Sequence, residues 1–280
     1  MTAAQPLVTL GVPVRNGAGM LRAALDSIVA QDYPNIEIVV SDNASDDATP
    51  DILAEYAARH PNMRVIRQEK PLTAIDNFLF VLRKAKGEFF AWCAHDDTRS
   101  ADFVSGLVRA FESPTTVLAF CDLYIWDGSQ GRVLRSDYDF ANVGLSAWQR
   151  LRKAADMQCY HFYGLWRTAA LREIKYKYTH WWSDMPIVLA ATTLGDFRHL
   201  PGPEFNYYEI IKPDTTTARY HNQLVHKGRS HDIYSLLRAT FVTLRRTSGW
   251  IPALLGTSCI FEKYRRRAFE IALGRMFWSR

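Results

Sequence analysis

Residues 89–97 read Phe-Phe-Ala-Trp-Cys-Ala-His-Asp-Asp, an aromatic and apolar run that ends in two adjacent carboxylates. Such a run is typical of a buried strand, so Asp96 and Asp97 are expected directly after the strand ends. Two neighbouring carboxylates repel each other unless positive charge lies close by. Hard divalent cations prefer oxygen ligands, and the pair therefore predicts a Mg²⁺ or Mn²⁺ site. A cation that also binds a diphosphate would stabilise that diphosphate as a leaving group.

Strand and helix patterns alternate on the N-terminal side of this stretch. We expect strands over 7–12, 36–40, 63–67 and 88–93, and helices over 20–30, 49–59 and 75–85. This alternation with short loops predicts βαβ units, and hence an α/β fold with a mostly parallel sheet flanked by helices. Ligands of such sheets bind beyond the carboxyl ends of the strands. Arg15 with Asn16, Asp42, and Asp96 with Asp97 follow three of these strands, so they are expected to converge on one edge.

The rest of the chain is less regular. A helix is expected over 102–111, followed by a strand over 117–126 that turns back into 132–135. Residues 136–182 are rich in Tyr, Trp and His, a composition that suits a sugar-binding wall and a protein core equally well. The last 60 residues are mostly helical in pattern and predict a C-terminal helical extension.

Positive charge is concentrated in residues 221–280, which hold 11 Lys or Arg against 3 Asp or Glu, a balance of +8. The whole chain of 280 residues carries +5, so residues 1–220 carry −3. A basic, amphipathic C-terminal segment favours an anionic membrane surface as partner. A helix packed on the protein with a solvated basic face fits the pattern as well. No nucleic-acid-binding module accompanies the charge, so nucleic acid is not expected as a partner.

Several classes of protein are disfavoured by what the sequence lacks. The four cysteines have no metal-site spacing, no His-Glu-x-x-His is present, and no Gly-x-Gly-x-x-Gly follows the first strand. The N-terminus lacks the basic and apolar regions of a secretory signal. The longest apolar run is shorter than the roughly 20 residues that span a bilayer. These features lead us to expect a cytoplasmic protein, peripheral at the inner membrane face if its basic helices bind lipid.

Six segments resemble, in the same order, those of the inverting family-2 glycosyltransferases, which have the GT-A fold. The segments are Val-Pro-Val-Arg-Asn-Gly at 12–17, Glu-Ile-Val-Val-Ser-Asp-Asn-Ala-Ser-Asp-Asp at 37–47, the stretch 77–88, His-Asp-Asp at 95–97, Gly-Leu-Trp-Arg-Thr-Ala-Ala-Leu at 164–171, and 183–195. The resemblance covers residues 7–217. Three departures stand out. Ala94 replaces an acidic residue of the metal motif, the Gln-x-x-Arg-Trp signature of processive synthases is absent, and Lys212 stands where many relatives have His.

The resemblance implies transfer of a sugar from a nucleoside diphosphate sugar to an acceptor hydroxyl, on a glycan or lipid-linked glycan, in polysaccharide biosynthesis. It assigns Asp184 as the general base. The residues that would bind the nucleotide sugar are Pro13, Arg15, Asp42, Asn77, Asp96 and Lys212. Asp96 and Asp97 would bind Mg²⁺ or Mn²⁺, and the acceptor would contact Trp181, Trp182, Arg167 and His161. The implied organisation is a nucleotide-sugar half over 1–115, an acceptor half over 116–220 and the basic extension over 221–280.

Each of these residues also has an ordinary structural reading. Asp42 could stabilise a turn after its strand, the acidic pair could cap the next helix, and Asp184 could cap its own helix. Two other functions remain open. One is a catalytically degenerate GT-A protein that serves as a binding or scaffold module, which Ala94 favours. The other is a sugar nucleotidyltransferase, which would need a Gly-rich basic loop that residues 15–19 resemble only faintly. The sequence gives no indication of the oligomeric state.

Overall fold

The computed structural model describes residues 5–127, 131–134, 140–156, 159–176, 184–208 and 230–278. Contacts between residues divide the chain into two compact units. Unit 1 consists of Met1–Ala141, Tyr160–Ala169 and Phe197–Lys227. Unit 2 consists of Asn142–Cys159, Ala170–Asp196 and Gly228–Arg280. These bounds differ from the three predicted segments, because middle parts of the chain return to the sheet of unit 1 or join the C-terminal helices of unit 2.

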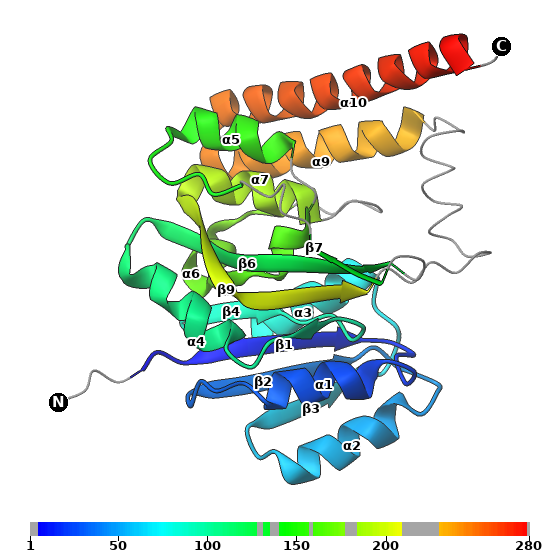
Figure 1. The fold of residues 1–280 in the computed structure, drawn as a ribbon, viewed down its shortest axis with the longest axis vertical. Helices are drawn as coiled ribbons and strands as arrows, with labels where there is room; N and C mark the ends of the chain where they lie inside the picture. The colour runs from blue at the N-terminus through cyan, green and yellow to red at the C-terminus, as the bar shows by residue number, and fades with distance from the viewer. Residues whose placement is uncertain are drawn as a thin grey trace. The chain divides into compact units, whose positions relative to one another are not determined.

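The N-terminal half of unit 1 is a parallel sheet with the strand order β3-β2-β1-β4 (Figure 1). Its strands are β1 (Val8–Val14), β2 (Ile36–Asp42), β3 (Met63–Arg67) and β4 (Phe89–Trp92). The connecting helices are α1 (Leu21–Val29), α2 (Thr49–Arg59) and α3 (Ala74–Lys84). The predicted α/β fold with βαβ units is therefore confirmed. Of these seven elements, β3 and α2 match their expected bounds, and the other five differ from them by at most two residues at either end.

Beyond β4 the same sheet continues through β8, β6, β9 and β5, and β7 pairs with β6. The pairs β4–β8, β6–β8, β6–β7 and β5–β9 are antiparallel. These strands are β5 (Thr98–Arg99), β6 (Thr116–Asp127), β7 (Gly131–Leu134), β8 (Leu165–Arg167) and β9 (Asp196–Tyr208). Between them lie α4 (Phe103–Val108) and the short 3₁₀ helices η1 (Arg109–Glu112) and η2 (Cys159–Tyr163). The sheet is thus parallel in its first half and antiparallel in its second.

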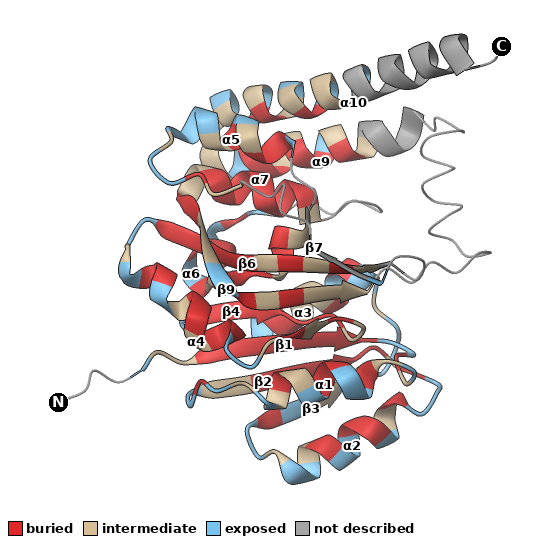
Figure 2. Cartoon of the chain, viewed as in Figure 1, coloured by how far each residue is buried: buried red, intermediate tan, exposed pale blue. Residues whose placement is uncertain are grey.

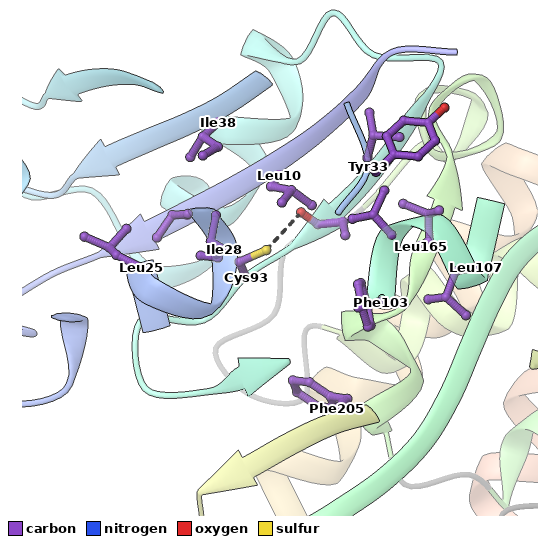
Figure 3. Packing of buried hydrophobic residues seen from close by; sticks show 14 of the residues in the cluster. Leu10, Leu25, Ile28, Tyr33, Ile38, Cys93, Phe103, Leu107, Leu165 and Phe205 are labelled. Carbon is purple, nitrogen blue, oxygen red and sulfur yellow. Dashed lines mark hydrogen bonds between the residues drawn. The ribbon is translucent and has the colours of Figure 1, made fainter. Parts of the chain in front are cut away.

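The core of unit 1 lies on both faces of the central strands. Every residue of β1 and β4 is buried, as Figure 2 shows for these two strands. Leu10 of β1 belongs to a cluster with Leu25 and Ile28 of α1 and Phe103 of α4, drawn in Figure 3. Burying each such side chain stabilises the fold by about 1.5–3 kcal/mol. This rigid core fixes where β1, β2 and β4 end.

Strand β1 runs two residues beyond its expected end, through Pro13 to Val14. A strand with a neighbour on each side uses its backbone N–H groups for hydrogen bonds to both neighbours. Proline has no N–H to donate and is therefore disfavoured in such a strand. Here the pairing of β1 with β4 has already stopped at Gly11 and Trp92, while the pairing with β2 continues to Val14 and Asp42. Pro13 therefore lies where β1 has a strand neighbour on only one side, and the strand tolerates it.

Unit 2 is helical. It contains α5 (Ala147–Ala155), most of α6 (Thr168–Glu173), α7 (Asp184–Leu194), α9 (Ser230–Ser248) and α10 (Trp250–Trp278). Helix α7 is buried from Met185 to Thr192 and contacts α5 and α9, while α10 contacts α9 and α5. The predicted C-terminal helical extension is present. Among the described helices, none is both long and apolar enough to cross a membrane.

Candidate functional site

Three loops meet at one edge of the parallel sheet. β1 is parallel to both of its neighbours, with Val14 opposite Asp42 of β2 and Gly11 opposite Trp92 of β4. Gly17 lies so close to the loop after β4 that a Cβ placed on it would be 2.5 Å from Cδ2 of His95. The expected convergence of the loops after β1, β2 and β4 is confirmed.

Hydrogen bonds join the loop after β1 to the loop after β2. The N–H of Asn16 donates to Oγ of Ser45 at 3.0 Å, and the N–H of Gly17 donates to Oγ1 of Thr49 at 2.9 Å. Asp47 accepts from the N–H groups of Thr49 and Ala18. A hydrogen bond from the Thr49 side chain, and secondarily these backbone bonds, lower the pKa of the Asp47 carboxyl group. Asp47 therefore has a structural role at the start of α2. Arg15 is exposed beside this joined pair of loops.

Asp42 is almost fully buried, at 1% exposure, at the end of β2. Its Oδ1 accepts from the N–H of Ser45, and its Oδ2 forms an ion pair of 3.0 Å with Nη1 of Arg67. Arg67 lies opposite Asp42 in the register of β2 and β3, and its exposed guanidinium also donates to the carbonyl of Ser45 at 2.7 Å. Charge-assisted bonds of this kind are strong and directional. Asp42 thus holds its loop in place, and Arg67 presents its positive charge at the same edge.

Arg67 is a residue that the sequence reasoning missed. The available signal was its place as the last residue of the third expected strand, next to the strand that ends in Asp42.

Two other predicted donor-binding residues lie inside the protein. Asn77, on α3, is 3% exposed, and its amide both accepts from Oγ of Ser41 at 2.6 Å and donates to the Ser41 carbonyl at 3.3 Å. It therefore supports β2 from within. Pro13 is buried in β1. A direct contact of either residue with a donor stays a prediction.

The acidic pair has two different environments. Asp96 is about one-third exposed, and its Oδ1 lies 3.9 Å from Nδ1 of His95. Asp97 is 1% exposed and its Oδ1 accepts from the N–H of Tyr208, the last residue of β9, at 3.2 Å. Burial, and secondarily the neighbouring charge of Asp96, raise the pKa of Asp97 to about 8. Asp96 is therefore the accessible carboxylate, and Asp97 lies behind it.

The chemistry of this pair fits a divalent cation. No cluster of three or more His, Cys, Asp or Glu side chains suited to a metal occurs in the described parts of the chain. Two carboxylates are nevertheless what Mg²⁺ typically takes from a protein, because its remaining ligands are waters and substrate phosphates. A cation here would also oppose the charge repulsion between Asp96 and Asp97, which adds to burial in raising the pKa of Asp97.

A buried arginine follows the acidic pair. Arg99 is 4% exposed, and none of its three guanidinium nitrogens has a hydrogen-bond partner among the described residues. Its guanidinium lies 5.2 Å from the ring centre of Phe103 and 5.7 Å from that of Phe205. The positive charge of Arg99 acts to lower the pKa of Asp97. Sequence reasoning missed this residue, because nothing in its position distinguishes a buried arginine from a solvated one.

The structure places Arg167 away from the converging loops, and its contact with an acceptor stays a prediction. This residue of β8 pairs with Phe89, the first residue of β4, whereas the acidic pair follows the last. Its Nε donates to the Thr116 carbonyl at 3.2 Å, and its guanidinium lies over the rings of Phe89 and Phe111. Arg167 is therefore at the opposite edge of the sheet from the converging loops, and its contacts are structural.

His161 is buried at 5% exposure, with its ring edge-on to Phe120 and Phe140. It lines a cavity of about 20 Å³, together with Tyr160 and Tyr163 among other residues. That volume is room for about one water molecule. This cavity is too small for a sugar, and an acceptor contact of His161 stays a prediction.

Asp184 is the first residue of α7, and its Oδ1 accepts from the N–H of Met185 at 3.0 Å. It is half-buried. This geometry agrees with the capping reading and leaves the general-base role a prediction. Trp181, Trp182 and Lys212 lie outside the described residues.

The family model for glycosyl transferase family 2 matches residues 9–174. That match covers more than half of the chain and includes all three converging loops, so the protein belongs to glycosyl transferase family 2.

Curated relatives match shorter stretches. The putative glycosyltransferase EpsH of Bacillus subtilis is 34% identical over 133 residues, which are 47% of this chain and 38% of the relative. Glycosyltransferase GlyA of Streptococcus pneumoniae is 28% identical over 165 residues, 57% of this chain and 23% of the relative. An uncharacterized protein of Mycobacterium tuberculosis is 44% identical over 80 residues, 28% of this chain and 23% of the relative. The chain spans less than two-fifths of the length of these relatives.

Solved structures share the fold. TarS of S. aureus, residues 1–349 in complex with UDP, aligns with a TM-score of 0.66 and 18% identity over 93% of this chain and 71% of that chain. The mannosyltransferase PcManGT of Pyrobaculum calidifontis, in complex with GDP-Man and Mn²⁺, aligns with a TM-score of 0.59 and 19% identity over 99% of this chain and 89% of that chain. These similarities confirm the predicted GT-A fold.

Proposed function

We propose that the protein is an inverting glycosyltransferase that moves a sugar from a nucleoside diphosphate sugar to an acceptor hydroxyl. The observation that carries the proposal is the convergence of the Asp42 loop and the acidic pair on one sheet edge, inside the segment that matches the family. In this arrangement the nucleoside would lie near Asp42 and Arg67, and the diphosphate would extend toward Asp96. The nucleotide-sugar complexes of TarS and PcManGT support the donor class.

Asp96 and Asp97 would hold a divalent cation, and Mn²⁺ in the PcManGT complex supports this choice. Such a cation neutralises the charge that develops on a diphosphate leaving group. The fold holds these carboxylates in place. Strand β4 orients the loop that carries them, and the N–H of Tyr208 donates to Asp97. Lys212 would add positive charge near the phosphates.

Inversion at the anomeric carbon needs one in-line displacement. The acceptor oxygen forms a bond to that carbon as the bond to the diphosphate oxygen breaks, and a carboxylate takes the acceptor proton. We assign this base role to Asp184, whose position at the start of α7 fixes its side chain. Trp181 and Trp182 would stack against the acceptor sugar. The acceptor would be a glycan or lipid-linked glycan of polysaccharide biosynthesis, met at a membrane surface.

Donor hydrolysis tests the proposal without knowledge of the acceptor. UDP-, GDP- and dTDP-sugars are incubated with the full chain with and without Mn²⁺, and released nucleoside diphosphate is measured. We expect one donor class to be hydrolysed slowly with Mn²⁺, Asp96→Asn to lose most of that activity, and the exposed Asp51→Asn on α2 to retain it. Failure to hydrolyse any donor would instead favour the catalytically degenerate binding or scaffold module.

A further inference from the structure

Helix α10 has an apolar outer face. Trp250, Ile251, Leu254 and Phe261 are exposed to 58%, 71%, 56% and 56% of their surface, and we call these four residues the outer stripe. At about 100° per residue, all four lie within an arc of about 100° on the helix. Only two other large apolar side chains, Val143 and Trp148, are exposed among the described residues, and both also belong to unit 2.

The opposite face of the same helix segment is apolar as well. Ala253, Gly256 and Ile260 are buried. A Cβ placed on Gly256 would lie 2.4 Å from Leu244 of α9, so the two helices approach closely there. Within 250–261 the helix has few polar side chains, chiefly Thr257 and the exposed Ser258, and a helix with apolar residues on two faces is normally covered on both. The inner face of α10 is covered within unit 2, whereas each of the four residues of the outer stripe is more than half exposed. Figure 2 marks exposed residues of this helix in pale blue.

Positive charge borders the outer stripe. The guanidinium of Arg245 lies 4.2 Å from the ring centre of Trp250, and Arg246 is exposed beside it. No acidic residue occurs between Trp250 and Phe261, and the segment 221–280 carries a balance of +8, from 11 basic and 3 acidic residues. The exposed Arg265 follows on the same face, paired with Glu262 at 2.9 Å. A partner that binds this surface should therefore offer an apolar region for the outer stripe and negative charge beside that region for the arginines.

We propose that the outer stripe docks on an anionic lipid bilayer, with α10 lying in the plane of the interface. Apolar and aromatic side chains would enter the boundary between headgroups and acyl chains, while the arginines bind acidic headgroups. A tryptophan beside a cation suits this boundary, since indole is amphipathic. This docking would bring the enzyme to a lipid-linked acceptor. In that respect alone it deepens the proposed function and rests on it.

Vesicle flotation of the full chain tests the proposal. Vesicles of phosphatidylcholine alone are compared with vesicles that contain about one-third phosphatidylglycerol. We expect binding to the anionic vesicles, weakened by about 0.5 M NaCl because salt screens the arginines. The double variant Leu254→Ser/Phe261→Ser should bind at least about tenfold more weakly, because each lost side chain removes part of the buried apolar area.

The variant is chosen to keep the fold, since both side chains are mostly exposed. A matched control, Val143→Ser, removes an exposed apolar residue outside the stripe and should bind like the wild type. Failure of the wild type to bind anionic vesicles, or equal binding by the double variant, would overturn the proposal. Dimerisation of the wild type that the double variant abolishes, without vesicle binding, would identify a second copy as the partner and overturn it too.

Donor hydrolysis is measured on the same samples. The double variant should hydrolyse donor like the wild type, so a loss of vesicle binding alone supports the docking surface. A wild type that binds vesicles but has no donor hydrolysis would contradict the proposed function and leave the docking surface standing.

Discussion

Replacing Asp97 by asparagine is expected to stabilise the metal-free protein, and to stabilise it more as the pH rises. The reason is the raised pKa of this buried carboxyl group, about 8 against an ordinary value of 3.8. Between these two values the folded protein keeps a proton on Asp97 that the unfolded chain has already released. Stability therefore falls as the pH rises toward the folded-state pKa. Asparagine resembles the protonated carboxyl group in shape and cannot ionise, so the variant lacks this dependence.

The size of the effect follows from proton linkage. One proton of difference between the folded and unfolded states changes the free energy of unfolding by about 1.4 kcal/mol per pH unit. Between about pH 5 and pH 7 the wild type should thus lose about 3 kcal/mol that the variant keeps. At about 2 °C per kcal/mol for a chain of this size, the difference in Tm should grow by about 6 °C.

The measurement is thermal unfolding of both proteins across this pH range with chelator present. The difference between the two Tm values isolates Asp97, because all other titrating groups are shared. Asp51→Asn, which removes an exposed carboxylate on α2, serves as control and should follow the wild type at every pH. A Tm difference that stays constant with pH, or that shrinks as the pH rises, would refute the reasoning, because it would mean that Asp97 is ionised in the folded protein.

Three further predictions concern other residues of the candidate site. Asp184→Asn should leave donor affinity unchanged and lower turnover by about 10²–10⁴-fold, which is the usual scale for loss of a general base. A normal rate of transfer in a single-turnover assay would rule out Asp184 as the general base. Arg67→Ala removes the ion-pair partner of one oxygen of the buried Asp42. It should raise the donor KM several-fold in steady-state hydrolysis and destabilise the protein by about 1–3 kcal/mol, because a buried charged acceptor loses its partner. An unchanged KM would show that Arg67 does not act on the donor. Asn77→Ala leaves Ser41 without its buried partner and should destabilise the protein by about 1–3 kcal/mol in denaturant unfolding, and an unaltered midpoint would contradict the supporting role.

The parallel half of the sheet was predictable because its signals are local. Alternating apolar runs and helix patterns fix β1 to β4, and topology alone then brings the ends of β1, β2 and β4 to one edge. The strand β8 was not predictable in the same way. It has only three residues, and its pairing with β4 and β6 joins segments far apart in the chain.

The predicted site residues differ in the same way, because the position of some depends on local signals and that of others on long-range contacts. The place of Asp96 follows from the strand before it, and the structure bears out that place. Arg167 stood in a segment typical of the acceptor half, and its real environment depends on which end of β4 it pairs with. Arg99 and Arg67 were missed because burial and ion pairing of an arginine depend on tertiary contacts, which residue type and spacing do not encode.

The close approach of Gly17 to His95 has an evolutionary corollary. A Cβ at position 17 would lie 2.5 Å from the His95 ring and 2.8 Å from Cγ2 of Val14, so a larger residue fits there only if these side chains shift. In homologous sequences the two positions should therefore covary, with alanine or serine at 17 accompanied by a smaller residue at 95. An exchange to alanine at 17 would force the His95 and Val14 side chains to shift without removing any polar group, and it offers a purely steric way to perturb the site.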